Sequence, residues 1–210
     1  MTTDRARRRA PGRDERQRDP ERTKARIMEA AVEEFSAKGF AGARVSAIAR
    51  RAGVYQQLIA YYFDGKEGLF RELGRQWRAF EAETFPDDMA YAELIKGYVR
   101  VSVDDTRGGR LLAWAGLGDT GAADEDPEEA RERDARLRHE VEQIRERQKA
   151  GELDDRVDPA VLLLIIMGAA NALAVYPQLA RGLLGGDGSS PDVVERYAEQ
   201  LTLLVTKGDV

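Results

Sequence analysis

The 210-residue chain contains no cysteine and a single histidine, His139. The absence of thiols excludes disulfide bonds, thiolate metal ligands and cysteine nucleophiles. One histidine is too few for the usual multi-histidine zinc sites, and its position in a charged segment favours a surface role over a Ser-His pair. We therefore predict no catalytic residue, no metal site and no other cofactor, although composition leaves carboxylate-only catalysis open.

Long apolar runs and phosphate-binding glycine motifs are also missing. The most apolar segment, residues 160–175, contains Asn171 and is shorter than the about 18 residues expected of a membrane-spanning helix. No GxxxxGK motif occurs, and the first residues contain no apolar stretch typical of a signal peptide. These absences predict a soluble, cytoplasmic protein with no membrane partner.

The alternation of apolar and polar residues that is typical of β-strands is absent over any useful length. Apolar residues recur at helical spacings instead, so we predict an all-α fold. Asp19-Pro20 and Asp158-Pro159 each place a capping side chain before a proline at the first helical position. The expected helices are residues 19–38, 45–52, 54–63, 66–84, 91–103, 110–117, 127–150, 160–179 and 192–206.

The formal charge of −5 does not by itself indicate a nucleic-acid-binding protein, but the charges are unevenly distributed. Residues 1–75 contain 17 of the 33 Lys and Arg residues and 11 of the 38 Asp and Glu residues, so they carry +6 and the remainder carries −11. A basic N-terminal third on an acidic body fits a protein that approaches DNA with one end. A solvated basic tail is the alternative explanation.

Residues 1–18 are rich in arginine and show no apolar periodicity, so we expect them to be disordered in the absence of DNA. As an arm they would follow phosphates or enter a minor groove. As a tail they would only increase solubility. The candidate side chains are Arg5, Arg7, Arg8, Arg9 and Arg13.

Two short apolar patterns in the N-terminal third are separated by a glycine. Val45, Ile48 and Ala52 share one helical face. Gly53 follows, where a helix end favours a residue that tolerates positive φ. A second apolar pattern then continues to Phe63. Two short helices around a tight turn predict a helix-turn-helix, whose second helix enters the major groove of DNA.

Several short blocks stand in order through this motif: Ile48-Ala49, Ala52-Gly53-Val54, Tyr62-Phe63, Lys66-Glu67 and Leu69. Together they resemble the DNA-binding signature of the TetR family of bacterial transcriptional regulators, over residues 22–73. The resemblance implies a three-helix DNA-binding domain followed by a helical domain that binds a small molecule and forms a homodimer. We therefore expect an arm at 1–18, a DNA-binding domain at 19–65 and a ligand-binding and dimerisation domain at 66–210.

Gln56 and Gln57 fall on the side of the second motif helix that its apolar residues leave free. Glutamine reads adenine edges through paired donor and acceptor contacts. Tyrosine hydroxyls suit DNA phosphates, and so does Lys66 at a helix N-terminus. A bland polar surface is the alternative for the glutamines, and core packing for Tyr62. The candidate DNA-binding residues are Arg44, Ser46, Tyr55, Gln56, Gln57, Ala60, Tyr61, Tyr62 and Lys66.

Aromatic residues and one asparagine in the second domain are candidates to line a ligand pocket, because such pockets are mostly apolar with a few polar groups. Ordinary core packing is the alternative for each residue taken singly. The candidates are Trp77, Phe80, Tyr98, Trp114, Met167, Asn171 and Tyr176. The expected helix 66–84 runs from the DNA-binding domain to this region, so we expect it to tilt when a ligand binds.

The segment 160–179 is apolar nearly all round, and such a helix is buried on more than one side. The last expected helix offers a second apolar face. Paired with their symmetry mates, the two helices would form a four-helix dimer interface, as the resemblance also implies. The candidate contacts are Leu163, Ile166, Leu173 and Leu201.

Our leading interpretation is a ligand-responsive repressor, not an enzyme, that binds a palindromic double-stranded DNA operator as a homodimer and is released by a small-molecule effector. A transcriptional activator is the alternative within this class. Two other classes stay open: an α-helical enzyme that uses the second-domain cavity, and a helical binding module without specific DNA recognition. The latter is conceivable because Tyr55 and Leu58 replace residue types that are common in the family.

Overall fold

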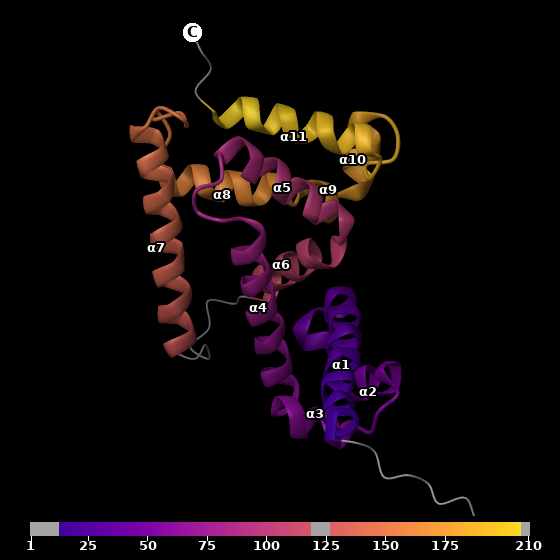
Figure 1. Ribbon diagram of the computed structural model, residues 1–210. Helices are drawn as coiled ribbons and strands as arrows, with labels where there is room; N and C mark the ends of the chain where they lie inside the picture. The colour runs from indigo at the N-terminus through magenta and orange to yellow at the C-terminus, as the bar shows by residue number, and fades with distance from the viewer. Residues whose placement is uncertain (1–12, 119–126, 207–210) are drawn as a thin grey trace, which may run out of the picture.

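The computed structural model describes residues 13–118 and 127–206, which form eleven helices and, as their only β-type pairing, an isolated bridge between Leu153 and Thr206. The predicted all-α fold is confirmed. Figure 1 shows α1 to α3 at one end and α5 with α8 to α11 at the other, with α4 and α6 between them. The helices are α1 (Arg13–Gly42), α2 (Val45–Ala52), α3 (Gln56–Phe63), α4 (Gly65–Thr84), α5 (Tyr91–Asp104), α6 (Thr106–Gly118), α7 (Pro127–Lys149), α8 (Pro159–Ala170), α9 (Ala172–Val175), α10 (Pro177–Leu184) and α11 (Pro191–Val205).

The end formed by α1, α2, α3 and the first turns of α4, called the head below, has its own hydrophobic core. Phe35 of α1, Ile48 of α2, Ile59 of α3 and Leu69 of α4 are completely buried there. Burying one such side chain contributes about 1.5–3 kcal/mol. Because α2 and α3 have only eight residues each, too few for a stable isolated helix, this packing is what holds them in place.

The turn between α2 and α3 has the geometry that its glycine predicts. Gly53 has φ 64°, a left-handed conformation that is open to glycine without strain. Arg26 of α1 donates hydrogen bonds to the carbonyls of Ala52 and Gly53. A Cβ atom at Gly53 would lie 2.6 Å from this guanidinium. Glycine therefore permits both the turn and its attachment to α1.

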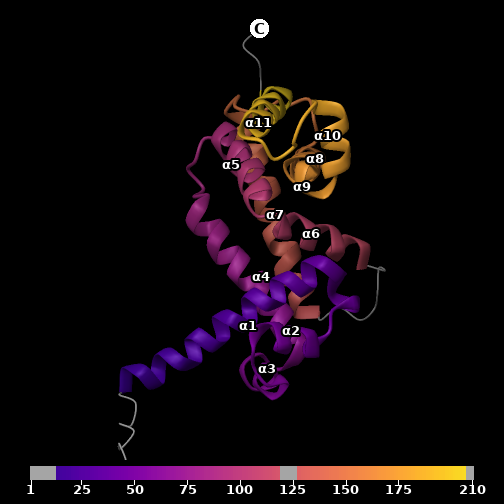
Figure 2. The ribbon, with the colours of Figure 1, turned by 90° about the vertical axis from the view of Figure 1, so that its right-hand side faces the viewer.

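The start of α1 differs from the expected one. The helix begins at Arg13 and contains Pro20, although the Asp19-Pro20 pair predicted that the helix would begin at these two residues. Figure 2 shows these first turns projecting away from the head. Straight-chain Arg, Glu and Gln residues favour helix upstream of the proline. Residues 13–18 of the expected disordered arm are thus helical, and residues 1–12 lie outside the described residues.

The expected helix 19–38 ends directly before a kink in α1 at Gly39. Gly39 has non-helical angles, φ 68° and ψ 175°, and one further turn then leads to Gly42. The backbone N–H of Ala43 donates to the Gly39 carbonyl at 3.1 Å, which closes this turn. The chain therefore leaves α1 at a fixed angle before α2 begins.

The other end of the molecule, made of α5 and α7 to α11 and called the body below, has a second hydrophobic core. Ile95 and Val99 of α5, Ile144 of α7 and Ala198 of α11 are completely buried in it. Helix α5 packs against α8, α9 and α11, while α7 packs on α8. The two cores share no residue, and α4 and α6 connect the parts of the chain that contain them.

Helix α6 includes Gly108 and Gly109, although residues 104–109 were expected to separate two helices. The break falls earlier, at Asp105. Gly109 is buried, and a Cβ atom there would lie 3.1 Å from both the Asn171 Oδ1 atom and the Ala174 Cβ atom. The missing side chain therefore lets α6 approach α9 closely, which compensates for the low helix propensity of glycine.

The expected helix 160–179 is divided into α8, α9 and the start of α10. Tyr176 separates α9 from α10, with Pro177 at the first position of α10, because a proline cannot continue the preceding helix, and Asn171 separates α8 from α9. Asn171 Nδ2 donates to the Met167 carbonyl at 2.9 Å. Among the described residues, no helix combines the length and the apolar character needed to cross a bilayer.

Candidate nucleic-acid interface

Helix α3 turns one side to the head core and the other to solvent. Ile59 is buried, while Gln56, Gln57, Ala60 and Tyr61 are exposed. Their spacing places these four on one side of the helix. Helix α3 lies at the end of the molecule farthest from α11 (Figure 1). The two glutamines thus have the accessible position that reading a DNA groove requires.

Three tyrosines flank these glutamines. Tyr55, directly before α3, and Tyr61 have exposed fractions of 82% and 79%. Tyr62 is half-buried, with Tyr61 edge-on at 5.0 Å between ring centroids and the Lys24 Nζ atom 5.8 Å from its own ring centroid. Its ring packs on the head, as the core-packing alternative expects. Tyr55 and Tyr61 leave large amphipathic side chains free for a partner.

Lys66 lies in the first turn of α4, close to the connection between α1 and α2. Its Nζ atom is 4.6 Å from the ring centroid of Phe40 and 3.5 Å from the Ala41 carbonyl oxygen. The unpaired amides of a first helical turn add positive potential at such a position. A lysine there attracts an anion, and a DNA phosphate fits this chemistry.

The start of α2 depends on a residue that sequence analysis missed. Glu34 of α1 is buried, and its Oε1 atom accepts hydrogen bonds from Lys38 Nζ at 2.7 Å and from the backbone N–H of Arg44 at 3.3 Å. The bond from Lys38, together with that from Arg44, holds the pKa of Glu34 below its ordinary value. Glu34 therefore fixes where α2 begins and positions the exposed side chains of Arg44 and Ser46.

Arg50 is a second residue that the motif did not single out. It is exposed and lies one helical turn after Ser46 on α2. Its spacing from Ser46 is the signal that would have found it. Arg44, Ser46 and Arg50 together add cationic and hydroxyl groups beside α3.

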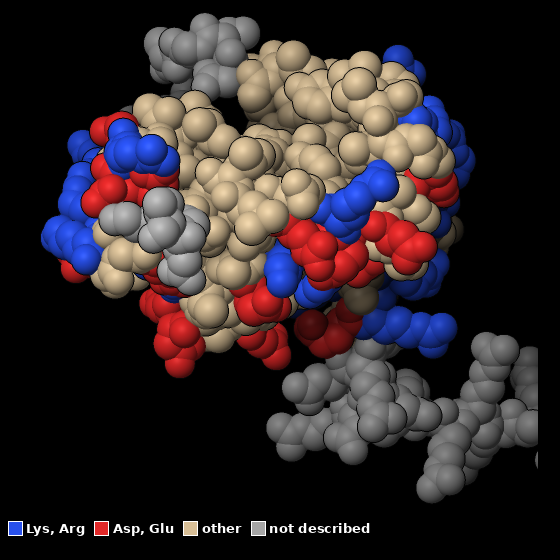
Figure 3. Space-filling view, turned by 90° about the horizontal axis from the view of Figure 1, so that it is seen from above, with Lys and Arg blue, Asp and Glu red and all other residues tan. Residues whose placement is uncertain are grey.

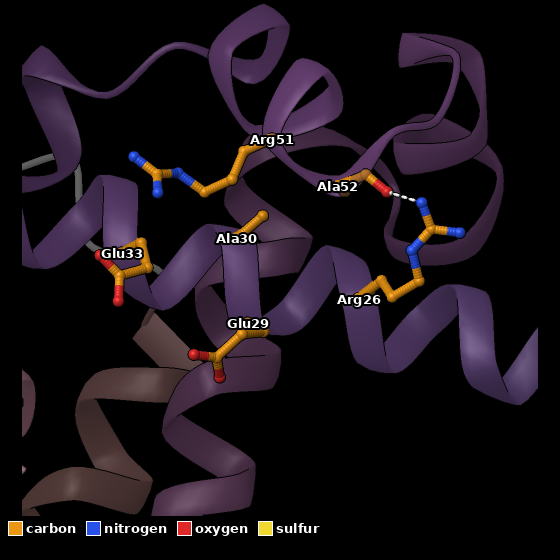
Figure 4. Close-up of a pocket in the computed structure, with 6 residues that line it drawn as sticks. All are labelled: Arg26, Glu29, Ala30, Glu33, Arg51 and Ala52. Carbon is orange, nitrogen blue, oxygen red and sulfur yellow. Dashed lines mark hydrogen bonds between the residues drawn. The ribbon is translucent and has the colours of Figure 1, made fainter.

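Two open depressions lie on the head. The first lies between α1 and α2, where the Arg26 guanidinium is turned towards the Ala52 carbonyl (Figure 4). It is lined by Arg26, Glu29, Ala30, Glu33, Arg51 and Ala52. The second lies beside the start of α3 and is lined by Thr23, Arg26, Gly53, Val54, Tyr55 and Leu58. The residues predicted to line a ligand pocket belong to neither.

Some of the predicted pocket residues do lie close together. Trp77 and Phe80 of α4 are partly exposed, with 5.5 Å between ring centroids. Tyr98 of α5 donates from its hydroxyl to Glu81 Oε1 at 2.6 Å and stacks on Phe85 at 4.2 Å. Burial raises the pKa of Tyr98, and this hydrogen bond raises it further. Aromatic rings and a carboxylate thus gather where α4 meets α5.

Helix α7 brings another carboxylate towards this region. Burial raises the pKa of Glu140, and the negative charge of Glu81 raises it further. Met167 and Asn171 are half-buried, whereas Tyr176 is exposed. The structure therefore brings together only some of the residues predicted to line a ligand pocket.

Trp114 lies apart from the other predicted pocket residues, on the side of α6 that contacts α1. Its indole Nε1–H donates to the Ser36 carbonyl at 3.2 Å. The ring covers Gly39, where a Cβ atom would lie 2.9 Å from the Trp114 Cε3 atom. The structure thus places Trp114 at the contact between head and α6. Sequence periodicity cannot identify such a contact because the two helices are distant in the chain.

The residues predicted to form the dimer interface face the core of their own chain. Ile166, Leu173 and Leu201 are buried there, and Leu163 is half-buried against the same core. A side chain that is enclosed in its own core offers little surface to a second subunit, so these four contacts stay a prediction. The exposed apolar residues of the same helices are Val161, Leu164 and Ile165 of α8 and Leu203 and Leu204 of α11. Figure 3 shows a broad area of uncharged residues at this end of the molecule.

Comparisons with known proteins agree with this geometry. Residues 27–73 match the family model for bacterial regulatory proteins of the tetR family, and residues 92–199 match a tetracyclin repressor-like C-terminal domain. The HTH-type transcriptional repressor SCO4008 of Streptomyces coelicolor is 37% identical over 182 residues, which are 83% of this chain and 90% of that protein. The HTH-type transcriptional regulator RutR of Escherichia coli is 38% identical over 88 residues, 40% of this chain and 41% of RutR.

A solved structure shares the whole fold. The putative transcriptional regulator SCO4942 from Streptomyces coelicolor superimposes with a TM-score of 0.66 at 25% identity, and the match covers 89% of this chain and 99% of that one. Two family models together span most of the chain, and a relative is 37% identical over 83% of it. The chain therefore belongs to the TetR family and is a helix-turn-helix transcriptional regulator.

Proposed function

We propose that this regulator is a repressor that binds an inverted-repeat operator as a homodimer and is released by a small-molecule effector. The observation that carries the proposal is the exposed side of α3, where Gln56 and Gln57 stand between Tyr55 and Tyr61. Arg44, Ser46, Arg50 and Lys66 surround this side with groups that suit phosphates. The repressor SCO4008, 37% identical to this chain, supports repression over activation.

Two copies of the chain are needed because one head reads only one half-site. Leu164 and Leu204 have exposed fractions of 72% and 79%, although each lies on a helix whose other side forms the body core. Apolar patches of this kind mark protein interfaces. Pairing α8 and α11 with their symmetry mates covers them, and a two-fold axis between the bodies relates the two heads by the same symmetry that relates the half-sites of an inverted repeat.

The effector site is proposed for the region where α4 meets α5 and α7. Trp77 and Phe80 offer aromatic surface there, and Glu81 and Glu140 offer carboxylates. Carboxylates beside aromatic faces attract flat cations. Aromatic cations are therefore the first effectors to test, and neutral aromatic compounds of equal size are their controls.

Selection of bound sequences from random DNA duplexes tests the proposal. We expect inverted repeats whose half-sites lie a whole number of helical turns apart, each contacted by one head. The selected duplex is then titrated with candidate effectors at constant salt, because salt alone weakens phosphate contacts. Recovery of single asymmetric sites, or of no enriched sequence at all, would contradict the proposal.

A further inference from the structure

Helix α6 is attached to α1 of the head at two places. Near its start, the Arg107 Nη1 atom donates to Glu29 at 2.6 Å and to Glu33 at 3.1 Å. Towards its end, Arg110 Nε donates to the Ser36 carbonyl at 3.1 Å, and Trp114 Nε1 donates to the same oxygen at 3.2 Å. The two attachments hold α6 along the surface of α1, so the helices are expected to move together.

The Trp114 ring of the second attachment also covers Gly39, the residue at which α1 is kinked. Gly39 has φ 68°, and a Cβ atom there would lie 2.9 Å from Trp114 Cε3. Only glycine allows both this backbone conformation and an indole ring directly on the backbone. Trp114 therefore contacts the turn that leads from α1 to the DNA-binding motif.

The same turn supports Lys66. Phe40 follows Gly39 directly, and its ring lies 6.0 Å from that of Phe35 and 5.2 Å from that of Phe70. The Lys66 Nζ atom lies 4.6 Å from the Phe40 ring centroid and 3.5 Å from the Ala41 carbonyl oxygen. The position of this turn thus determines where the lysine charge is held.

The opposite side of α6 contacts the body and α4. A Cβ atom at Gly109 would lie 3.1 Å from Asn171 Oδ1, and one at Gly108 would lie 3.8 Å from the Trp77 ring. Both contacts involve residues that the sequence assigns to the ligand pocket. Helix α6 therefore touches the proposed effector region on one side and the turn below Lys66 on the other.

We propose that Trp114 is a positioning residue for DNA binding. Its contact with Gly39 fixes the turn at Phe40 and Ala41. That turn holds the Lys66 ammonium group where it contacts a DNA phosphate. The proposal rests on the proposed function, because it assigns Lys66 to the operator backbone. It makes α6 a second connection between body and head, in addition to α4. Movement of α6 then changes a phosphate contact while the base-reading side of α3 is unaltered.

A double-mutant cycle tests the proposal with full-length protein and a selected operator duplex. The variants are Trp114→Phe, which removes the N–H donor, Lys66→Met, which keeps the stem on Phe40, and the combination. We expect Trp114→Phe to weaken binding about fivefold, at the low end of typical coupling. The dependence of log affinity on log salt should become shallower in Trp114→Phe and approach that of Lys66→Met. In the Lys66→Met background the Trp114 change should have no further effect.

Fluorescence provides a test that leaves the contact between Trp114 and α1 unchanged. The chain has two tryptophans, so Trp77→Phe leaves Trp114 as the single reporter. We expect its emission to change when the duplex saturates the head. Leu117→Ala, at an exposed position on α6, is the matched control and should change neither emission nor affinity.

The outcomes separate the two proposals. Additive losses in the double mutant, or Trp114 emission that is unchanged by saturating duplex, would overturn the role of Trp114 and leave the proposed function intact. If the wild-type protein bound no duplex at all, the proposed function would be overturned, and the role of Trp114 with it.

Discussion

At the scale of single residues, the head separates groups that read bases from groups that hold the backbone. Gln57 is exposed on α3, while Lys66 rests on Phe40 beside the start of α4. A glutamine that pairs with an adenine discriminates one base, whereas a lysine on a phosphate does not. The two residues should therefore give different binding signatures when replaced.

Replacing Gln57 by Ala should relax base preference at one position in each half-site by about 1–3 kcal/mol. Lys66→Met should weaken all sequences alike and lower the salt slope by about one for each lost phosphate contact. The measurement is affinity for the operator and for single-base variants at several salt concentrations. Identical behaviour of the two variants would show that this division of roles is wrong.

Glu34 links the same head to pH. Because the bonds from Lys38 and Arg44 hold its folded pKa below the ordinary value, folding stabilises the charged form. This contribution is fully present above the ordinary value of 4.5 and is lost as pH falls through the lowered folded pKa. Glu34→Gln should therefore destabilise the protein at neutral pH and make its unfolding free energy less dependent on pH below 4.5.

Denaturant unfolding of both proteins across this pH range measures the effect of Glu34→Gln. Glu93→Gln is a suitable control, because its ion pair with Lys96 spans one turn on the exposed surface. Equal pH dependence in wild type and Glu34→Gln would rule out the role given to Glu34.

At the scale of elements, α8 and α11 each have two apolar sides with different tasks. Ile166 and Leu201 face the core, and Leu164 and Leu204 face outward. A charge on the outward side should leave folding largely intact, because it stays in water in the monomer. Leu164→Glu should nevertheless convert the dimer to a monomer at micromolar concentration, since two-fold symmetry brings the new charges close together or buries them.

Sedimentation velocity with and without DNA checks this prediction. Leu117→Glu, on exposed α6, is the matched control and should stay dimeric. The monomeric variant should also lose most of its operator affinity, because a single head remains. A wild-type protein that sediments as a monomer would contradict the interface outright.

At the scale of the whole molecule, an effector in the body acts on DNA only through its different affinity for two arrangements of the heads. A tenfold loss of operator affinity requires about 1.4 kcal/mol of coupling. We expect saturating operator to weaken effector binding by the same factor, because coupling between two binding sites is reciprocal. Calorimetric titration with operator and with a scrambled duplex measures this. Unchanged affinity would exclude that compound as the effector.

The motif from α2 to α4 was predictable because its signals are local. The apolar spacing around Ile48 and Ile59 and the positive φ of Gly53 depend on a few neighbouring residues. The start of α8 belongs to the same category, since Asp158 caps it by accepting hydrogen bonds from the N–H groups of Ala160 and Val161. Local steric and hydrogen-bonding rules determine such features wherever the segment lies in the fold.

Tertiary structure alone decided which side of the apolar segment 160–179 faces inward. A helix that is apolar all round carries no preferred side, so Ile166 and Leu164 are indistinguishable in sequence until α5 packs against one of them. The roles of Gly109 and Trp114 likewise could not be predicted from the sequence. Each has its role because a helix distant in the chain, α9 for Gly109 and α1 for Trp114, lies within van der Waals distance. The sequence by itself determined a helical DNA-binding head, and long-range packing determined how that head is connected to the body.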